Sequence, residues 1–285
     1  MKNALVVFNY NAGRKKAILY KKIIHKFLLK RCSLFKFVSI DDLENTDLKG
    51  YDTIFAVGGD GTVNKVARII AGTDKILAII PSGTANLLSA KLGIPPSLKK
   101  ALKIIDKNNI KKIDALNINN CPSFLRCGFG YDSDIICKTP QSIKNDFGYF
   151  AYFLAGIIFA LKLNIRTYDI NVDGKNIKIK ASCIIVANSA NMYQNWVSVG
   201  RKSELDDGLM DVFALNTKNP VLFFIEFLKI LLNIKFNTKK TKYFKTNKLT
   251  IKNNWIACHI DGEKMKLKND INISVIPQIL NVYSK

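Results

Sequence analysis

Histidine is scarce in this sequence: the 285 residues contain only His25 and His259, which are far apart along the chain. A metal site built from several histidines is therefore impossible, and a histidine-based catalytic triad is disfavoured. The six cysteines never occur as Cys-x-x-Cys, so the pattern predicts neither a zinc ribbon nor a disulfide framework. Scattered thiols of this kind are typical of a protein in a reducing compartment.

The sequence also lacks an apolar run of about 20 residues, the length that a transmembrane helix requires. Two stretches come nearest, residues 149–161 and residues 221–236, and the second contains Glu226, Lys229 and Lys235. The apolar start of the chain is too short for a secretory signal peptide. We therefore expect a cytoplasmic protein.

Acidic residues are few: 22 Asp and Glu stand against 44 Lys and Arg, which gives a formal charge of +22. Such an excess favours an anionic partner, which can be nucleic acid, a nucleotide or the headgroups of a membrane. A general lysine and asparagine bias, visible in KNNIKKIDALNINN, can explain part of it. With 48% hydrophobic residues, the composition is that of an ordered globular protein, long enough for two domains.

The first third of the chain alternates strand and helix patterns. Compact apolar runs predict buried strands, and apolar residues at helical spacing predict helices between them. The predicted strands are residues 4–8, 35–40, 53–57 and 76–80, and the predicted helices are 17–29, 63–70 and 86–92. This order predicts an α/β domain with a parallel sheet over residues 1–115. Ligands of such sheets bind beyond the carboxyl ends of the strands.

From about Ile113 onward the strands become shorter and are separated by Asn, Asp and Gly. The predicted strands are residues 123–128, 169–172, 177–187, 210–215, 248–251 and 256–260, with helices around 149–163 and 220–234. This pattern predicts a mainly antiparallel, β-sandwich-like domain over residues 116–274, and the tail 275–285 can return to the first domain. Asp173-Gly174 and Asp261-Gly262 are both typical of hairpin turns.

The most informative segment stands between a predicted strand and a predicted helix, and it reads Gly58, Gly59, Asp60, Gly61, Thr62, Val63 and Asn64. Its glycines let backbone amides approach a polyphosphate, and the helix points its N–H groups at the same place. A carboxylate repels phosphate, so Asp60 makes sense if it orients a magnesium ion, a water or a reacting hydroxyl. The alternative is a plain turn, because the segment is neither a Walker A loop nor a dinucleotide fingerprint.

A second glycine turn, Pro81-Ser82-Gly83-Thr84-Ala85-Asn86, follows the next strand and leads into a helix. Two such loops from neighbouring strands can hold a nucleotide from two sides, and Gly83, Thr84 and Asn86 are the candidates in this one. We also place Asn9 and Ser39, at the ends of the first two strands, among the nucleotide-binding candidates. An ordinary turn into a helix remains the alternative for the second loop.

The segments GGDGTVNKVA and IIPSGTANLLSAKLGIP together resemble the paired signature of the diacylglycerol kinase catalytic-domain family, whose bacterial members phosphorylate lipids. The opening VVFNYNAG is similar to the first-strand motif of that family, although Tyr10 replaces its usual proline and Lys65 replaces a common glutamate. The resemblance covers residues 5–263. It implies an NAD kinase-like nucleotide-binding lobe that uses ATP, a β-rich second lobe, and catalysis in the cleft between them.

Two acidic segments of the second domain resemble the same family. SELDDGLMDV implies a magnesium ion held by the Asp207 carboxylate and the carbonyls of Glu204 and Leu209. The DGE segment implies a carboxylate that accepts the proton of a lipid hydroxyl, with Asp261 and Glu263 as equal candidates. Without the family resemblance, an acidic turn and a hairpin turn explain these segments.

The sequence therefore predicts a magnesium- and ATP-dependent lipid kinase at the inner face of an anionic membrane, with no nucleic-acid partner. The stretches 149–161 and 221–236 would contact the membrane, unless they are core helices. Two rivals stand against it: an NAD kinase-like enzyme, disfavoured by Gly-Thr-Ala-Asn, and a basic protein that binds membranes or nucleic acid without turnover. The acceptor is left open among diacylglycerol, phosphatidylglycerol, another glycerolipid and a sphingoid base.

Overall fold

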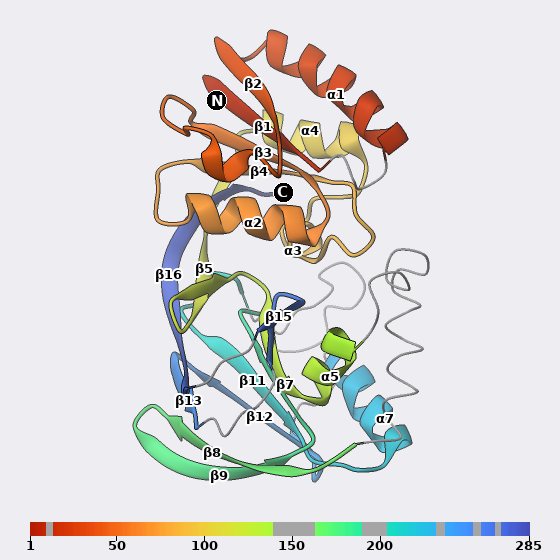
Figure 1. The fold of residues 1–285 in the computed structure, drawn as a ribbon, viewed down its shortest axis with the longest axis vertical. Coiled ribbons are helices and arrows are strands. Elements are labelled where there is room, and N and C mark those ends of the chain that lie inside the picture. Colours follow the sequence, from red (N-terminus) through yellow and green to blue (C-terminus); the bar gives the residue numbers. More distant parts are fainter. Residues whose placement is uncertain (10–13, 139–162, 190–203, 232–236, 253–257, 266–268) are drawn as a thin grey trace. The chain divides into compact units, whose positions relative to one another are not determined.

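The computed structural model describes residues 1–9, 14–138, 163–189, 204–231, 237–252, 258–265 and 269–285 (Figure 1). The chain divides into two compact units. Unit 1 comprises Met1–Ile113 and Gln278–Lys285, and unit 2 comprises Asp114–Pro277. The predicted helix at 149–163 lies almost entirely outside the described residues, as do the loop after Asn9 and the start of the predicted strand 256–260.

Unit 1 contains the predicted parallel sheet. Its strands are β1 (Asn3–Phe8), β2 (Leu34–Ser39), β3 (Thr53–Gly58) and β4 (Ile76–Pro81), in the order β2-β1-β3-β4. The last residues of β16 (Ile271–Tyr283) extend this sheet, parallel to β4, through Asn281 and Val282. Strands β1, β3 and β4 are nearly continuous apolar runs because both faces of the sheet are covered.

Helices connect these strands: α1 (Arg14–Leu29), α2 (Asp60–Ile70), α3 (Leu87–Lys91), α4 (Leu98–Asp106) and a short 3-10 helix, η1 (Leu43–Asn45). The chain passes through α1 from β1 to β2 and through α2 from β3 to β4, in opposite directions across the sheet. Right-handed crossovers then put α1 and α2 on opposite faces, as Figure 1 shows. The strand order therefore reverses between β1 and β3, which is where such sheets bind ligands.

Unit 2 contains two layers of antiparallel strands. One sheet runs in the order β12-β11-β10-β7-β14-β15. Its strands are β7 (Arg126–Gly130), β10 (Cys183–Ala187), β11 (Met210–Leu215), β12 (Thr241–Thr246), β14 (Cys258–Ile260) and β15 (Glu263–Met265). The other layer contains β5 (Ile110–Ile118), β6 (Cys121–Ser123), β8 (Arg166–Val172), β9 (Lys175–Ala181), β13 (Lys248–Ile251) and the first residues of β16. The two-domain fold class predicted from the sequence is thus confirmed.

The predicted strand 177–187 is wrong as a single element. The chain forms β9 up to Ala181 and β10 from Cys183, and these two strands belong to different sheets. Ser182 stands at the change, where its N–H and its hydroxyl both donate to the carbonyl of Leu215, at 2.8 and 3.0 Å. The burial changes at the same place, because β9 is mostly exposed whereas every residue of β10 is buried.

Side chains from both layers of unit 2 form its main core, which includes Phe129, Tyr168, Ile184 and Val212. A second cluster of buried side chains covers the other face of the six-stranded sheet. It involves two helices, α5 (Tyr131–Lys138) and α7 (Pro220–Leu231). Asn219 is the N-cap residue of α7, because its Oδ1 accepts the N–H groups of Val221 and Leu222. Among the described residues, no helix has the length and apolar character needed to cross a membrane.

Candidate functional site

The carboxyl ends of four parallel strands meet at one edge of unit 1. The strand register pairs Phe8 with Ser39 and with Val57, and it pairs Gly58 with Pro81. Asn9, Ser39 and the two glycine loops therefore follow neighbouring strands at the same edge. This edge includes the position between β1 and β3 where the strand order reverses, so the topology favours a ligand site here.

The two glycine loops touch each other at Gly59 and Gly83. A Cβ atom on Gly83 would lie 2.5 Å from the Cα of Gly59, and a Cβ on Gly59 would lie 3.3 Å from the Cα of Gly83. No side chain fits at the contact, so both loops present bare backbone there. Backbone N–H groups in such loops are the donors that phosphate groups use. The arrangement fits the phosphate chain of a nucleotide.

Two polar side chains hold the loops in this shape. The Oδ1 atom of Asp60 accepts the N–H of Leu87 at 2.6 Å, which ties the first loop to the start of α3. Asn86 has the left-handed φ of 50°, and its amide both accepts the N–H of Gly83 and donates to the Gly83 carbonyl, at 3.1 and 2.7 Å. The carboxylate predicted to orient a cation or a water therefore also stabilises the loop pair.

Several predicted nucleotide-binding residues lie inside unit 1. Val63 and Thr62 are buried, and the Thr62 Oγ1 accepts a hydrogen bond from the Asn9 Nδ2 at 3.2 Å. Asn64 is only 1% exposed, yet neither polar atom of its amide has a hydrogen-bond partner. A buried amide without a partner costs about 1–3 kcal/mol, so a bound molecule or water is needed to satisfy it.

Two of the other candidates in the two loops are open to solvent. Gly61 and Thr84 are exposed, and Gly58, Gly59, Asp60, Gly83 and Asn86 are buried or half-buried beside them. Gly61 has nothing within 4 Å of the position that a Cβ would occupy. Ser39 is half-buried and its hydroxyl lies 3.3 Å from the carboxylate of Asp41. A ligand therefore has access to the loop backbone, and the buried side chains beneath support that backbone.

In unit 2, Asp261 is the anchor of the DGE turn. Its Oδ1 accepts the Ser123 hydroxyl at 2.6 Å and the N–H groups of Leu125 and Arg126 at 3.1 and 3.0 Å. Its Oδ2 accepts the N–H of Phe124 at 3.3 Å. The Asp261 carboxylate is thus committed to four donors of one segment, which stabilises the turn.

A buried histidine holds the same turn from the other side. The Nε2 of His259 lies 2.6 Å from the Oδ2 of Asp132, and its Nδ1 accepts the N–H of Gly262 at 3.3 Å. Because Nδ1 is an acceptor, the ring proton belongs on Nε2 and points to Asp132. Asp261 and Gly262 both have positive φ, as the predicted hairpin turn requires. Glu263 begins β15 directly after this turn and is exposed.

Arg126 completes the cluster, since one of its nitrogens lies 3.1 and 3.0 Å from the two oxygens of Asp132. Burial by itself raises the pKa of Asp132, but the Arg126 guanidinium and the His259 imidazole outweigh burial and hold that pKa well below its usual range. A Cβ on Gly128 would overlap both the Asp132 carboxylate and the His259 ring. No local sequence pattern reveals this cluster, because His259 lies 127 positions after Asp132 in the chain.

We expect Asp132→Asn to lower the free energy of unfolding by about 3 kcal/mol at neutral pH, since it leaves Arg126 without its ionic partner. The folded pKa of Asp132 is depressed, so its contribution is present above the unfolded pKa and is lost as pH falls through the folded value. The difference between variant and wild type should therefore shrink below about pH 4. Urea unfolding at several pH values measures it; a pH-independent difference would contradict the ionic role.

The acidic turn at 204–209 is shaped by a residue that is not among the predicted site residues. Asp114 is 1% exposed, its Oδ2 accepts the N–H of Gly208 at 2.8 Å, and its own N–H donates to the carbonyl of Leu205 at 2.7 Å. Within the turn, the Asp207 Oδ1 accepts the N–H of Leu209 at 3.1 Å. A lone aspartate in a strand gives no signal of this partnership.

The predicted magnesium ligands lie together in this turn, but they do not form an open cation site. Carboxylate and carbonyl oxygens suit Mg²⁺. However, the Oδ2 of Asp207 lies 2.6 Å from the Nζ of Lys245, so an ammonium group already pairs with the carboxylate that a cation would need. Within the described part of the chain, no cluster of three or more His, Cys, Asp or Glu could hold a metal. These residues therefore fit Mg²⁺ only if Lys245 moves away.

Removing the Lys245 ammonium should create the site. We expect Mg²⁺ to raise the melting temperature of Lys245→Met by about 4 °C at saturation, and to leave the wild type unchanged. The double variant Lys245→Met/Asp207→Asn should lose the response, because it lacks the carboxylate. Thermal unfolding with and without Mg²⁺ tests this, and an equal shift in wild type and Lys245→Met would show that Lys245 does not compete.

Comparison with known proteins extends over nearly the whole chain. Residues 3–118 match the diacylglycerol kinase catalytic domain, and residues 126–284 match the YegS C-terminal NAD kinase beta sandwich-like domain. The Bacillus subtilis (strain 168) protein named diacylglycerol kinase is 26% identical over 92% of this chain and 90% of its own length. A Citrobacter koseri protein named probable lipid kinase YegS-like is 35% identical over 38% of each chain.

A further relative and a solved structure are also similar to this chain. The uncharacterized protein sll0036 of Synechocystis sp. is 27% identical over 85% of this chain, which spans 57% of that longer protein. The crystal structure of a putative diacylglycerol kinase from Bacillus anthracis shares the fold, with a TM-score of 0.80, 21% identity, and coverage of 100% of this chain and 95% of that one. The match over residues 126–284 alone covers more than half of the 285 residues, and the match over residues 3–118 covers most of the rest. The chain therefore belongs to the diacylglycerol kinase catalytic-domain family, in the branch with a YegS-type C-terminal domain.

Proposed function

We propose that this protein is a lipid kinase that transfers the γ-phosphoryl group of ATP to the hydroxyl of a diacylglycerol-like lipid, with Mg²⁺ at the nucleotide. The observation that carries the proposal is the backbone contact between Gly59 and Gly83, because two glycine loops that pack together at the carboxyl edge of the sheet, after β3 and β4, present bare backbone N–H groups to a phosphate chain. Relatives named diacylglycerol kinase and lipid kinase support the choice of a lipid acceptor.

The nucleotide would be held by unit 1. The N–H groups of the two loops and of the first turn of α2 would bind the phosphates, where the positive end of the helix dipole favours them. Asn9 and Ser39, at the same edge, are the further candidates. When bound, Mg²⁺ neutralises negative charge on the phosphates, and Asp60 is the carboxylate that would orient it or one of its waters.

The acceptor would be activated by Glu263. Asp261 is unsuited to this role since four donors of residues 123–126 occupy its oxygens, whereas Glu263 is exposed. Glu263 takes the hydroxyl proton as the lipid oxygen bonds to the γ-phosphorus, and the bond from that phosphorus to the bridging oxygen breaks, leaving its electron pair on ADP. The proposal requires that Glu263 and the bound nucleotide act on one phosphoryl group.

Because the acceptor resides in a bilayer, we also propose that this protein works as a peripheral enzyme at the inner face of a cell membrane. The excess of 44 basic over 22 acidic residues supports attraction to anionic lipid headgroups. The same excess would also suit nucleic acid, but glycine loops beside a carboxylate serve phosphoryl transfer rather than duplex recognition.

The decisive assay supplies labelled ATP and Mg²⁺ with detergent-dispersed diacylglycerol, phosphatidylglycerol or a sphingoid base, and with NAD in solution. We expect label in diacylglycerol or a closely related glycerolipid. Transfer to NAD alone would establish a small-molecule kinase instead. Transfer to none of them, with binding of lipid intact, would indicate a non-catalytic protein.

The variant Asp60→Asn tests the role of charge in the first loop. Asparagine keeps an oxygen that can accept the N–H of Leu87, so the loop pair should stay folded. We expect turnover to fall at least about 100-fold, because the carboxylate charge near the transferred group is lost. The matched control is Asp74→Asn, an exposed position in the same unit. Turnover of Asp60→Asn within a few-fold of this control would contradict the proposed role.

A further inference from the structure

Helix α7 turns an apolar face to solvent. The exposed fractions are 66% for Val221, 40% for Leu222, 41% for Phe224, 41% for Ile225 and 36% for Leu228. These positions follow the helical repeat, so they line one face of the helix. An ordinary surface helix carries charged residues on that face. An apolar stripe of this size is typical of a surface that contacts a partner or a membrane.

The buried side of α7 holds a carboxylate instead. Glu226 is 7% exposed, and its Oε2 accepts the hydroxyls of Thr238 and Thr241, both at 2.8 Å. Its Oε1 lies 2.7 Å from the Nζ of Lys229 on the same helix. These bonds fasten the segment before β12 to the inner side of α7. Lys239 and Lys240 directly follow Thr238 in the chain, so these lysines lie beside α7.

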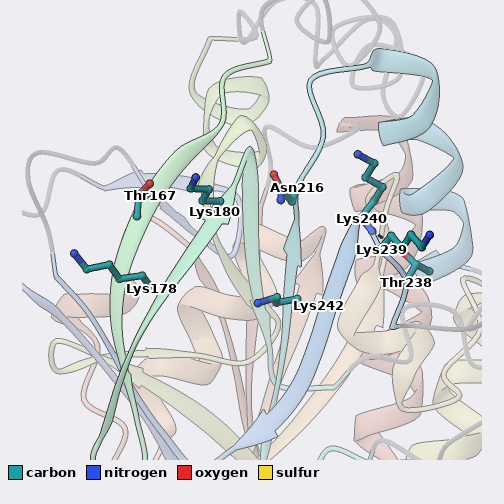
Figure 2. A pocket seen from close by; sticks show the side chains of 8 residues that line it. All are labelled: Thr167, Lys178, Lys180, Asn216, Thr238, Lys239, Lys240 and Lys242. Atoms are coloured by element: carbon teal, nitrogen blue, oxygen red, sulfur yellow. Dashed lines mark hydrogen bonds between the residues drawn. The ribbon is translucent and has the colours of Figure 1, made fainter.

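Those lysines line a hollow of about 390 Å³ on unit 2, shown in Figure 2, together with lysines from β9 and β12. The five are Lys178, Lys180, Lys239, Lys240 and Lys242. No Asp or Glu lines the hollow, and within the described chain only Lys178 has an acidic partner, Asp169, at 3.7 Å. Five ammonium groups around one depression create a strong positive potential, which favours anionic groups.

We propose that the apolar face of α7 and this lysine hollow form one surface that docks unit 2 on a bilayer containing anionic lipid. The side chains of α7 would enter the boundary between headgroups and acyl chains, and the lysines would bind lipid phosphates. This inference rests on the proposed lipid-kinase function, because such an enzyme has to reach an acceptor in the membrane.

Neither feature alone identifies a membrane, but their combination does. A soluble phosphate compound or a nucleic acid would account for the lysines and leave the apolar stripe unexplained. A second copy of this chain would cover the stripe, but it would bring two sets of five lysines together, and like charges repel. A bilayer with anionic headgroups satisfies both features at once.

The role of the lysine hollow is tested by sedimentation of the protein with vesicles of phosphatidylcholine alone or mixed with phosphatidylglycerol. We expect wild type to bind the mixed vesicles more tightly, and Lys239→Glu/Lys240→Glu to weaken that binding at least about thirtyfold, at roughly 1 kcal/mol for each lysine lost. The control Lys99→Glu/Lys100→Glu makes the same change in net charge at exposed positions of α4 and should have a much smaller effect. Equal losses in the two variants would overturn the assignment of this hollow.

The role of the apolar face is tested by comparing the vesicle binding of Val221→Gln/Ile225→Gln with that of Leu29→Gln/Leu34→Gln. The two leucines of this control pair are 60% and 52% exposed in unit 1. We expect the α7 pair to weaken vesicle binding about tenfold or more, because two apolar side chains leave the bilayer, and the control pair to bind like wild type. A fall in melting temperature or a changed molecular mass in the α7 pair, with vesicle binding intact, would show that protein covers this face and would overturn the proposal.

Turnover on detergent-dispersed short-chain diacylglycerol separates this inference from the proposed function, because no bilayer is present. All docking variants should retain wild-type turnover there. If wild type has no turnover but docks as expected, the kinase proposal fails and the docking surface stands. If turnover is normal and the variants dock like wild type, the docking proposal alone is refuted.

Discussion

Replacing Glu263 by glutamine should lower kcat for lipid phosphorylation by a factor of about 100 to 10,000, the usual contribution of a positioned general base. Glutamine has nearly the same shape but cannot take the proton of the acceptor hydroxyl. Because Glu263 is exposed, the change should leave the free energy of unfolding unaltered. The KM for ATP should also stay the same, since Glu263 belongs to the acceptor side of the proposed reaction. Steady-state kinetics with diacylglycerol as acceptor measure both constants.

Asp261→Asn distinguishes the anchor from the base. An amide cannot accept all four donors that the Asp261 carboxylate now accepts, so we expect this variant to be less stable by about 1–3 kcal/mol. Glu44→Gln, at an exposed position of unit 1, is the control for Glu263→Gln, because it makes the same change of residue and should leave turnover unaltered. The roles would be reversed if Asp261→Asn abolished turnover at unchanged stability while Glu263→Gln stayed active.

Gly83→Ala should weaken ATP binding at least about 100-fold, because a single methyl group cannot be placed between the two loops. The new Cβ would lie 2.5 Å from the Cα of Gly59 and 3.1 Å from the Oδ1 of Asn86. The nearest atom belongs to backbone, so one loop has to shift, at a cost of about 1–3 kcal/mol in stability. Separated loops no longer present their N–H groups to the same phosphates.

Gly61→Ala is the matched control for stability in the same loop. A Cβ there meets nothing within 4 Å, and the residue stands in the first turn of α2, where alanine is favoured over glycine. Calorimetric titration with ATP and urea unfolding of both variants give affinity and stability. Wild-type ATP affinity in Gly83→Ala would refute the assignment of the loop contact as the nucleotide site.

Local physics explains which parts of the fold were predictable. The strands of unit 1 are compact apolar runs, and their predicted ranges differ from β1, β2, β3 and β4 by a residue or so. The Asp-Gly turns were also predictable, because positive φ at both positions selects these residue types. Helix α4 was missed, although Leu98, Ala101, Leu102 and Ile105 are buried at helical spacing. The lysines interleaved with them mask the apolar pattern.

Long-range contacts explain which parts of the site were not predictable. The choice between Asp261 and Glu263 stayed open because the four donors of Asp261 lie more than 130 residues earlier in the chain. The pairing of Lys245 with Asp207 likewise joins β12 to the turn before β11, and no local pattern reveals the register of these two strands. Apolar periodicity reports which face of an element is buried, but not which element covers it.

The sequence by itself determined the alternating elements of unit 1, the glycine loops and the family to which their motifs point, because each depends on residues within one turn or strand. Only the tertiary structure decided that Gly59 and Gly83 touch, that Asp132 and His259 hold the turn before Glu263, and that α7 faces solvent with an apolar stripe. The physical reason is that contact between distant segments depends on how the sheets pack, and packing is a property of the whole fold.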